Sequence, residues 1–238
     1  MTNVSRVNSA VSLVTSPADG RLMLSRKAKA LFYSLSGPVM AVNGARHRLR
    51  SAPRGVARAH LGPGQNNYID GWINCDANIF TGKADRWIDL RNPLPFPDNS
   101  LDAVYSHHVV EHLPDMDAHF RDVLRVLKPG GVYRVGGPDA DVAIARYQAG
   151  DLDWFGVWPD KRRTSGGRLN NFLFCRGEHV ALLTEDFLRE LLEDAGFSSI
   201  QRSAPRQSNH PALFADVFPF EEDSPPHPMT VLLEVMKS

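Results

Sequence analysis

Short apolar segments alternate with amphipathic segments along most of the chain. Four apolar segments have the length and composition of buried parallel strands: residues 56–61, 72–75, 101–106 and 132–136. A final apolar run at 229–236 predicts one more strand. Strands that alternate with helical segments predict an α/β fold, with a doubly wound, mostly parallel sheet and helices on both faces.

Two helices between these strands have clear boundaries. Apolar positions between the third and fourth strands recur at helical spacing, namely Met116, Phe120, Val123, Leu124 and Leu127. The Lys-Pro-Gly-Gly sequence at 128–131 is expected to end this helix. A second helix is predicted over 184–195, because Thr184 is a suitable N-cap and Gly196 a suitable C-terminal stop.

The first 55 residues differ from the rest in charge and pattern. Residues 1–60 carry ten Lys/Arg and one acidic residue, whereas residues 61–238 carry 17 basic and 26 acidic residues. We therefore divide the chain into a basic arm, 1–55, and a domain, 56–238. Within the arm, residues 21–50 predict one or two basic amphipathic helices, with a break at Gly37-Pro38. Such helices suit an anionic membrane surface, packing on the domain, or an organelle transit peptide, and composition does not separate these alternatives.

Composition restricts the class of protein. No run approaches 18 consecutive apolar residues, so a membrane-spanning helix is not predicted. The two cysteines, Cys75 and Cys175, lie a hundred positions apart and form neither a CxxC pair nor a disulfide framework. This use of cysteine favours a reducing compartment, so we expect a cytoplasmic protein. If the arm binds a membrane, we expect the protein at the inner face of that membrane.

A glycine turn and an acidic residue follow the first two predicted strands. Gly62-Pro63-Gly64 lets the backbone turn tightly against a nucleotide-like ligand, although a purely structural turn fits this pattern equally well. A dinucleotide-binding turn would place a third glycine at position 67, which is Asn67. The second strand instead ends in Asp76, only twelve residues after Gly64. A carboxylate there suits the two hydroxyls of a ribose, and nicotinamide chemistry is disfavoured.

An ordered set of motifs resembles the class I S-adenosylmethionine-dependent methyltransferases. The motifs are Gly62-Pro63-Gly64, GWINCD (71–76), Asp89-Leu90, LPFPDNSLDAVYSHHVVEHL (94–113) and RVLKPGG (125–131). The subgroup they most resemble is the small bacterial methyltransferases associated with surface-polysaccharide synthesis. The resemblance covers about residues 56–200, excludes the arm and implies a Rossmann-like methyltransferase domain.

The resemblance assigns roles in binding the cofactor S-adenosylmethionine. It places Gly62 and Gly64 under the methionine part and Asp76 at the ribose. Asp89 and Leu90 would face the adenine, and Ser106 would lie beside the sulfonium. A helix cap or a surface turn is the alternative role for Asp89.

Residues 107–112 contain three histidines and one glutamate within six positions. On a helix, His108, Glu111 and His112 would share one face. The string H-x-x-E-H also matches a class of zinc proteases, but a zinc hydrolase needs a long helix here. Some metal-dependent O-methyltransferases carry a related E-x-x-E-H string and a later histidine, which His179 resembles. That resemblance implies a divalent metal held by His108, Glu111, His112 and His179, and such ligands favour zinc, manganese or iron over magnesium.

Catalysis without a metal is our first expectation for this cluster. Methyl transfer is an in-line displacement, so holding the acceptor against the methyl group supplies much of the acceleration. A hydroxyl acceptor also loses a proton, and His108, His112 or His179 is the expected base, with Asp139 as a carboxylate alternative.

The segment 146–183 is predicted to be a substrate-binding insertion. Its aromatic residues are Tyr147, Trp154, Phe155 and Trp158, and its basic residues include Lys161, Arg162, Arg163 and Arg168. These residues suit a sugar bearing a phosphate or carboxylate, although the aromatics would equally well cap the core. Because the domain is acidic, nucleic acid is disfavoured as a partner.

The sequence therefore predicts O-methylation of a sugar hydroxyl in a surface glycan or glycolipid. Methylation of a small aromatic or lipid-soluble metabolite is one alternative. A catalytically silent cofactor-binding module is the other.

Overall fold

A seven-stranded sheet forms the centre of the computed structural model, which describes residues 13–15, 22–24, 26–50, 53–78, 82–157, 159–221 and 229–238. The strand order is β5-β4-β3-β6-β7-β9-β8. The strands are β3 (Arg58–Leu61), β4 (Ile73–Asp76), β5 (Arg86–Trp87), β6 (Leu101–His107), β7 (Leu127–Pro138), β8 (Ser198–Arg202) and β9 (Thr230–Met236). Strand β9 runs antiparallel to both of its neighbours, β7 and β8. The predicted doubly wound, mostly parallel α/β sheet is confirmed, and each predicted strand is present.

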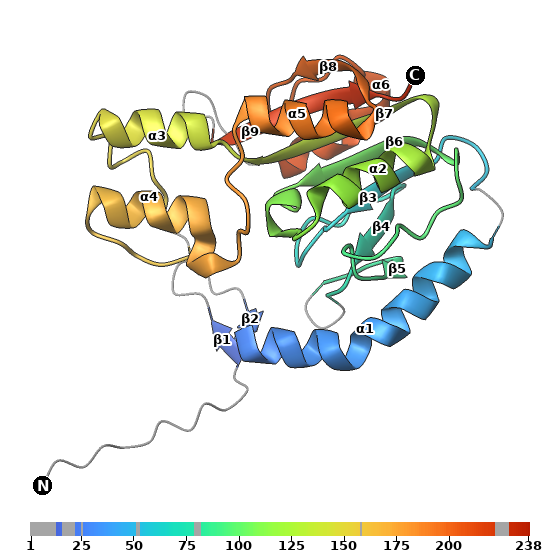
Figure 1. The fold of residues 1–238 in the computed structure, drawn as a ribbon, viewed down its shortest axis with the longest axis horizontal. Coiled ribbons are helices and arrows are strands. Elements are labelled where there is room, and N and C mark those ends of the chain that lie inside the picture. Colours follow the sequence, from blue (N-terminus) through green and yellow to red (C-terminus); the bar gives the residue numbers. More distant parts are fainter. Residues whose placement is uncertain are drawn as a thin grey trace, which may run out of the picture.

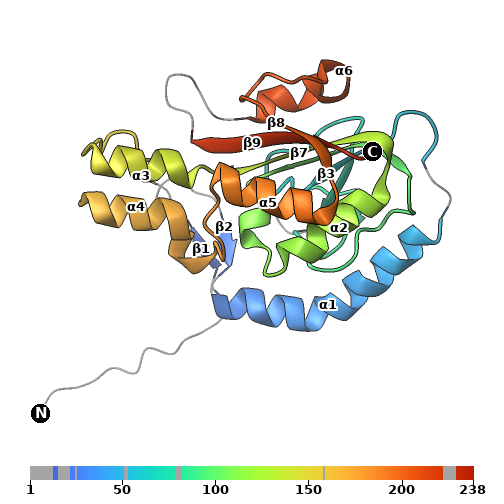
Figure 2. The same ribbon diagram turned by 45° about the horizontal axis from the view of Figure 1, so that its top comes forward.

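Helices cover both faces of this sheet (Figure 2). One face carries α2 (Met116–Val126) and α5 (Glu185–Ala195), and the other carries α6 (Pro211–Phe214) with the 3-10 helix η3 (Ala215–Phe220). Beyond the carboxyl end of β7 lie α3 (Ala140–Gln148), α4 (Ser165–Phe174) and the 3-10 turn η2 (Cys175–Gly177), while η1 (Val110–His112) follows β6. The two short strands β1 (Leu13–Thr15) and β2 (Leu22–Leu24) pair only with each other.

Capping residues mark the ends of the two helices that the sequence predicted. Asp115 caps α2 by accepting the Ala118 N–H at 2.9 Å. Thr184 caps α5 by accepting the Phe187 N–H at 3.2 Å, and Gly196 ends it in the left-handed region at φ +99°. Both helices bury their apolar faces in the main core, which lies between these helices and the sheet.

A single helix, α1 (Arg26–Arg48), replaces the broken arm that the sequence suggested. The predicted break at Gly37-Pro38 is wrong, because Pro38 lies inside the helix, whose ribbon bends about midway (Figure 1). Pro38 and Ser34 are both exposed, so water can satisfy the carbonyl group that a proline leaves unpaired. Meanwhile Ala28 and Met40, one in each half of the helix, are buried. Among the described helices, none is long and apolar enough to cross a membrane.

A buried ionic group joins the last strands beneath the other face. Arg134 on β7 donates to Glu221 Oε1 at 2.7 Å and to Glu234 Oε1 on β9 at 2.6 Å, and all three side chains are almost fully buried. A second apolar cluster, which includes Trp72, lies between this face and α6 with η3. Because the arginine satisfies two carboxylates at once, it ties the C-terminal strands to the segment that covers them.

Candidate functional site

The glycine turn lies at the carboxyl end of β3 and requires glycine. Gly62 and Gly64 have φ values of +73° and +60°. A Cβ atom at Gly62 would lie 2.5 Å from Val109 Cγ2, so the turn packs directly against the segment that leads into η1. The Gly62 N–H donates to the Cys75 carbonyl oxygen at 2.9 Å, which extends the pairing with β4. The turn is therefore rigid and compact, as close approach of a ligand to the backbone requires.

Asp76 meets this turn from the end of β4. Its Oδ2 accepts the Gly64 N–H at 2.8 Å, and its Oδ1 accepts the Asn78 N–H at 2.7 Å. Burial raises the pKa of this half-buried carboxyl, while the backbone N–H groups of Asn78 and Gly64 oppose the rise. The structure thus brings together the glycines and the acid that the sequence assigned to one cofactor.

Asp89 is buried and paired with its neighbour Arg91. Arg91 Nε lies 2.9 Å from Oδ1 and Nη2 lies 2.6 Å from Oδ2, and the Arg91 N–H also donates to Oδ1 at 3.0 Å. This is the surface-turn role that the sequence left open. The Arg91 guanidinium stacks on the ring of Tyr33 from α1, 4.0 Å from its centroid. Burial, followed by the charge of Asp89, raises the pKa of Tyr33.

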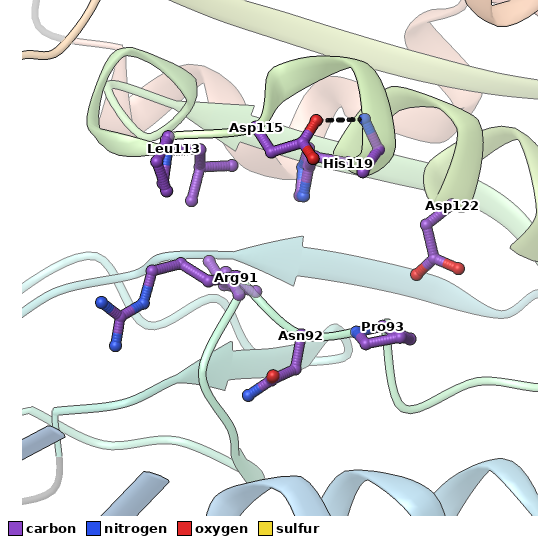
Figure 3. A pocket seen from close by; sticks show the side chains of 10 residues that line it. Arg91, Asn92, Pro93, Leu113, Asp115, His119 and Asp122 are labelled. Atoms are coloured by element: carbon purple, nitrogen blue, oxygen red, sulfur yellow. Dashed lines mark hydrogen bonds between the residues drawn. The ribbon is translucent and has the colours of Figure 1, made fainter. Parts of the chain in front are cut away.

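A cleft of about 160 Å³ borders this turn on the side of α2 (Figure 3). Arg91, Asn92 and Pro93 line one wall, and residues of α2 and the loop before it line the other: Leu113, Pro114, Asp115, Ala118, His119 and Asp122. Leu90 completes the lining and connects the cleft to Asp89, where the resemblance places adenine. The glycine turn and Asp76 do not line it.

Ser106 and Asp139 have structural partners. Ser106 is fully buried, and its Oγ lies 2.7 Å from the Tyr133 hydroxyl within the core. Asp139 caps α3 by accepting the Val142 N–H at 3.0 Å and pairs with Arg202 at 3.1 Å. Both side chains are buried and bonded within the protein, and the predicted roles of Ser106 beside the sulfonium and of Asp139 as a base stay predictions.

The expected helix through His108 is absent. Only Val110–His112 forms a helical turn, and His108 has a left-handed backbone with φ +55°. His108 Nδ1 lies 3.3 Å from Glu111 Oε1, and its Nε2 lies 3.1 Å from Thr230 Oγ1. The shared helical face of His108, Glu111 and His112 was therefore a wrong prediction. The long helix that a zinc hydrolase needs is also missing.

Glu111, His112 and His179 do converge. One potential ligand atom from each lies within 4.8 Å of the others, and the two imidazole rings meet edge to face. The Val180 N–H donates to the Glu111 carbonyl oxygen at 2.8 Å, which docks the segment after η2 on η1. Lys29 of α1 supports the same segment through a 2.6 Å ion pair with Glu178. Sequence reasoning missed Lys29 and Tyr33, because nothing local in the arm indicates these distant partners.

The aromatic residues of the insertion cap the core. Trp154 and Phe155 are buried in a small apolar cluster between α3 and α4. Arg162 pairs with Asp160 at 2.9 Å, and Arg168 donates to the Leu152 carbonyl oxygen at 2.6 Å. Tyr147, Lys161 and Arg163 remain exposed, and Trp158 lies outside the described residues. Thus only part of the expected sugar-binding surface is available.

Comparison with known proteins identifies a methyltransferase segment. Residues 82–135 match the family model described as "Methyltransferase domain". The chain is 31% identical over 110 residues to a ubiquinone/menaquinone biosynthesis C-methyltransferase of Shewanella halifaxensis, covering 45% of this chain and 43% of that protein. It is 50% identical over 42 residues to a sterol 24-C-methyltransferase of Aspergillus fumigatus, covering 18% of this chain and 11% of that protein. The chain thus spans less than half the length of these curated relatives.

Solved structures of methyltransferases match most of the chain at low identity and with TM-scores below 0.5. A methyltransferase of Thermotoga maritima, described as a possible histamine N-methyltransferase, has a TM-score of 0.47 and 15% identity, covering 90% of this chain and 96% of that one. A methyltransferase of Archaeoglobus fulgidus has a TM-score of 0.48 and 14% identity, covering 90% and 95%. The family match at residues 82–135 agrees with the predicted methyltransferase class, whereas the domain bounds 56–238 and the polysaccharide subgroup stay predictions.

Proposed function

We propose that this chain is an S-adenosylmethionine-dependent methyltransferase that methylates a hydroxyl group of a lipid-soluble acceptor. One observation carries the assignment of the cofactor. The glycine turn after β3 and the carboxylate after β4 meet at one sheet edge, joined by the 2.8 Å bond from the Gly64 N–H to Asp76. The match of residues 82–135 to the methyltransferase domain supports the same conclusion.

The residues present fit this cofactor. Gly64 leaves open backbone at the turn, since a Cβ there would meet no atom of the described residues within 4 Å. The Asp76 carboxylate is held in place with lone pairs available to ribose hydroxyls. S-adenosylmethionine would supply an electrophilic methyl group on its sulfonium. Val109 packs on Gly62 and lies two residues before Glu111, so the histidine cluster adjoins the cofactor turn.

His112 and His179 would then receive the acceptor. Each ring is bonded through Nδ1 to a carbonyl oxygen, so Nε2 carries the lone pair and can take up the proton of the hydroxyl. Positioning supplies the rest of the acceleration, since methyl transfer needs an in-line approach.

Three observations favour a lipid-soluble acceptor. The named relatives are a sterol 24-C-methyltransferase and a ubiquinone/menaquinone biosynthesis C-methyltransferase, and both names refer to lipid-soluble compounds, with transfer to carbon. Trp154 and Phe155 are buried, so they do not offer a stacking surface to a sugar. An exposed apolar stripe also lies along α1, beside the site. The second candidate is the sugar hydroxyl of a surface glycan or glycolipid, which the exposed Tyr147, Lys161 and Arg163 favour.

The test has a binding arm and a turnover arm. The full chain should bind S-adenosylhomocysteine in a calorimeter. With methyl-labelled S-adenosylmethionine it should transfer label to a component of a lipid extract and not to a glycan fraction. Label in the glycan fraction would select the second candidate. Binding without turnover in either fraction would indicate a silent module, and absence of cofactor binding would overturn the proposal.

A further inference from the structure

Two histidines of the site are fixed in one tautomer by the backbone. His112 Nδ1 lies 3.0 Å from the Glu178 carbonyl oxygen, and His179 Nδ1 lies 2.9 Å from the Leu173 carbonyl oxygen. A carbonyl oxygen can only accept, so each Nδ1 carries the proton. The lone pair of each ring is therefore on Nε2. Metal-binding histidines in proteins are oriented by this kind of bond.

Glu111 supplies a carboxylate with an unused oxygen. Its side chain is 1% exposed, and Oε2 has no hydrogen-bond partner anywhere in the described part of the chain. The other oxygen, Oε1, lies 4.0 Å from His112 Nε2. Oε1 is therefore the carboxylate oxygen that faces the His112 ring, while Oε2 lies toward Gly137 on β7. A buried carboxylate that is not fully paired favours a nearby cation.

The three ligand atoms could bind a small ion if the distances between them shortened slightly. They lie within 4.8 Å of one another. Bonds of about 2.0–2.2 Å in tetrahedral geometry place ligand atoms roughly 3.4 Å apart. Small rotations of the side chains close this difference, because His112 is on the surface and His179 follows a turn.

We propose that Glu111, His112 and His179 form a divalent transition-metal site of the two-histidine, one-carboxylate type. Two imidazoles and one carboxylate suit zinc, iron, manganese or cobalt, whereas magnesium prefers oxygen ligands alone. Three protein ligands leave a coordination position open, as catalytic sites do. His108 is excluded from the ligand set and instead positions Glu111. If the proposed function holds, the ion would take over the role given there to the two imidazoles, whose Nε2 lone pairs it occupies. It would bind the acceptor hydroxyl and lower its pKa, and the proton would leave to water.

Metal binding is tested without cofactor or acceptor. Chelator-treated full chain, titrated with zinc in a calorimeter, should bind one ion, and elemental analysis should find the same stoichiometry after dialysis. Glu111→Gln, His112→Ala and His179→Ala should each weaken binding at least about a hundredfold. His210→Ala, on the opposite face of the sheet, is the matched control and should bind as the wild type does.

Several results would overturn the site. They are no zinc binding by the wild type, full binding by His179→Ala, or equal losses in His210→Ala. His108→Ala should keep one ion per chain, and loss of the ion from both His108→Ala and His179→Ala would restore the four-ligand set expected from sequence. Circular dichroism identifies variants that do not fold, and His112→Ala and His179→Ala give independent readings if Glu111→Gln is one of them. Methyl transfer is measured separately, so failure of the metal site leaves the proposed function standing.

A second inference rests on the outer face of α1. Four apolar side chains on this face are spaced by three or four residues and are 47–70% exposed: Leu31, Leu35, Val39 and Val42. Leu49, which follows the end of the helix, is 88% exposed. Residues 26–54 contain seven Lys/Arg and no Asp/Glu, and Arg46, Arg50 and Arg54 are exposed near one end of the stripe. An apolar stripe beside exposed cationic groups matches a surface that is apolar inside and anionic outside.

The inner face of the same helix is already occupied. Met40 is buried, Asn43 Nδ2 donates to the Trp87 carbonyl oxygen at 2.8 Å, and Tyr33 and Lys29 contact the site. The outer stripe is therefore left exposed by a helix that is firmly attached. The ribbon of α1 runs along the edge of the molecule, below β5 in the view of Figure 1. We infer that α1 docks the protein on an anionic lipid surface through this stripe.

Vesicle sedimentation of the full chain tests this docking. Binding to phosphatidylcholine vesicles that contain phosphatidylglycerol should exceed binding to pure phosphatidylcholine and should fall with salt. Leu35→Glu should weaken it at least about tenfold, and combined replacement of Arg46, Arg50 and Arg54 by Gln about a hundredfold. Ile144→Glu, an equally drastic change at an exposed position on α3, should have no effect.

Two outcomes would overturn the docking surface. One is equal vesicle binding by Leu35→Glu and the wild type. The other is a dimer in analytical ultracentrifugation that Leu35→Glu abolishes while vesicle binding stays unchanged, because the stripe would then bind a second copy of the chain. Retained cofactor binding by Leu35→Glu would show that the site beneath α1 is intact.

Discussion

Replacing Asp76 by Asn tests the cofactor site most directly. The carboxylate accepts backbone N–H groups from Gly64 and Asn78, and the proposed function adds two ribose hydroxyls. A hydrogen bond to a charged group contributes about 1.5–3 kcal/mol, and a neutral one about 0.5–1.5 kcal/mol. Losing the charge at two ribose contacts should therefore cost about 2–3 kcal/mol, which is roughly a 30- to 150-fold loss of affinity.

The same substitution should have a smaller effect on folding. One backbone N–H loses its acceptor, since the amide nitrogen replaces an oxygen, at about 1–3 kcal/mol. Removal of a charge that burial disfavours offsets part of this loss, as the raised pKa of Asp76 indicates. Because protonation mimics the substitution, cofactor affinity should also fall on acidification, beginning at a higher pH than for an ordinary aspartate.

Calorimetry with S-adenosylhomocysteine and urea unfolding separate these effects. Asp70→Asn makes the same change of charge at an exposed position near the end of the loop that precedes β4, and it should bind as the wild type does. If Asp76→Asn retains affinity within about threefold of the wild type, the carboxylate does not hold the ribose. Equal losses in both variants would point to long-range charge alone.

Three further predictions concern stability and are checked by urea unfolding. Gly62→Ala should destabilise by about 2–4 kcal/mol, because it combines a positive φ with a Cβ 2.5 Å from Val109 Cγ2, and the reasoning fails if the variant is as stable as the wild type. Arg134→Leu should cost about 3–5 kcal/mol, since it leaves two buried carboxylates without their partner; an unchanged midpoint would contradict this. Burial lowers the pKa of His60 and of His119 to about 4. The folded state therefore binds fewer protons than the unfolded state between about pH 6.5 and 4. As the pH falls through this window, the free energy of unfolding should decrease by up to about 3 kcal/mol per histidine. Replacing both by Gln should flatten that dependence.

Local signals in the sequence predicted much of the fold. The apolar runs, the caps at Thr184 and Gly196 and the glycine turn at 62–64 all act over a few residues. Their outcome depends little on the rest of the chain, so they appear in the structure where they were expected. The adjacency of Gly64 and Asp76 also followed from the sequence, because the carboxyl ends of neighbouring parallel strands meet at one edge of the sheet.

The histidine cluster shows where local reasoning stopped. Spacing alone put His108, Glu111 and His112 on one helical face, but the left-handed backbone at His108 breaks that geometry. His179 comes to Glu111 and His112 only because the Val180 N–H binds the Glu111 carbonyl oxygen and Glu178 accepts from His112. These are contacts between residues far apart in the chain, and no local pattern encodes them.

The sequence by itself therefore determined strands β3, β4, β6, β7 and β9, helices α2 and α5, and the edge of the sheet that carries the chemistry. Tertiary structure alone decided which face of α1 is covered, that Tyr33 lies over Arg91, and that Trp154 belongs to the core. The physical reason is the range of the interactions. Hydrogen-bonded caps, turns and alternation of apolar residues are settled within a few positions, whereas burial and pairing of a side chain depend on which distant segment packs against it.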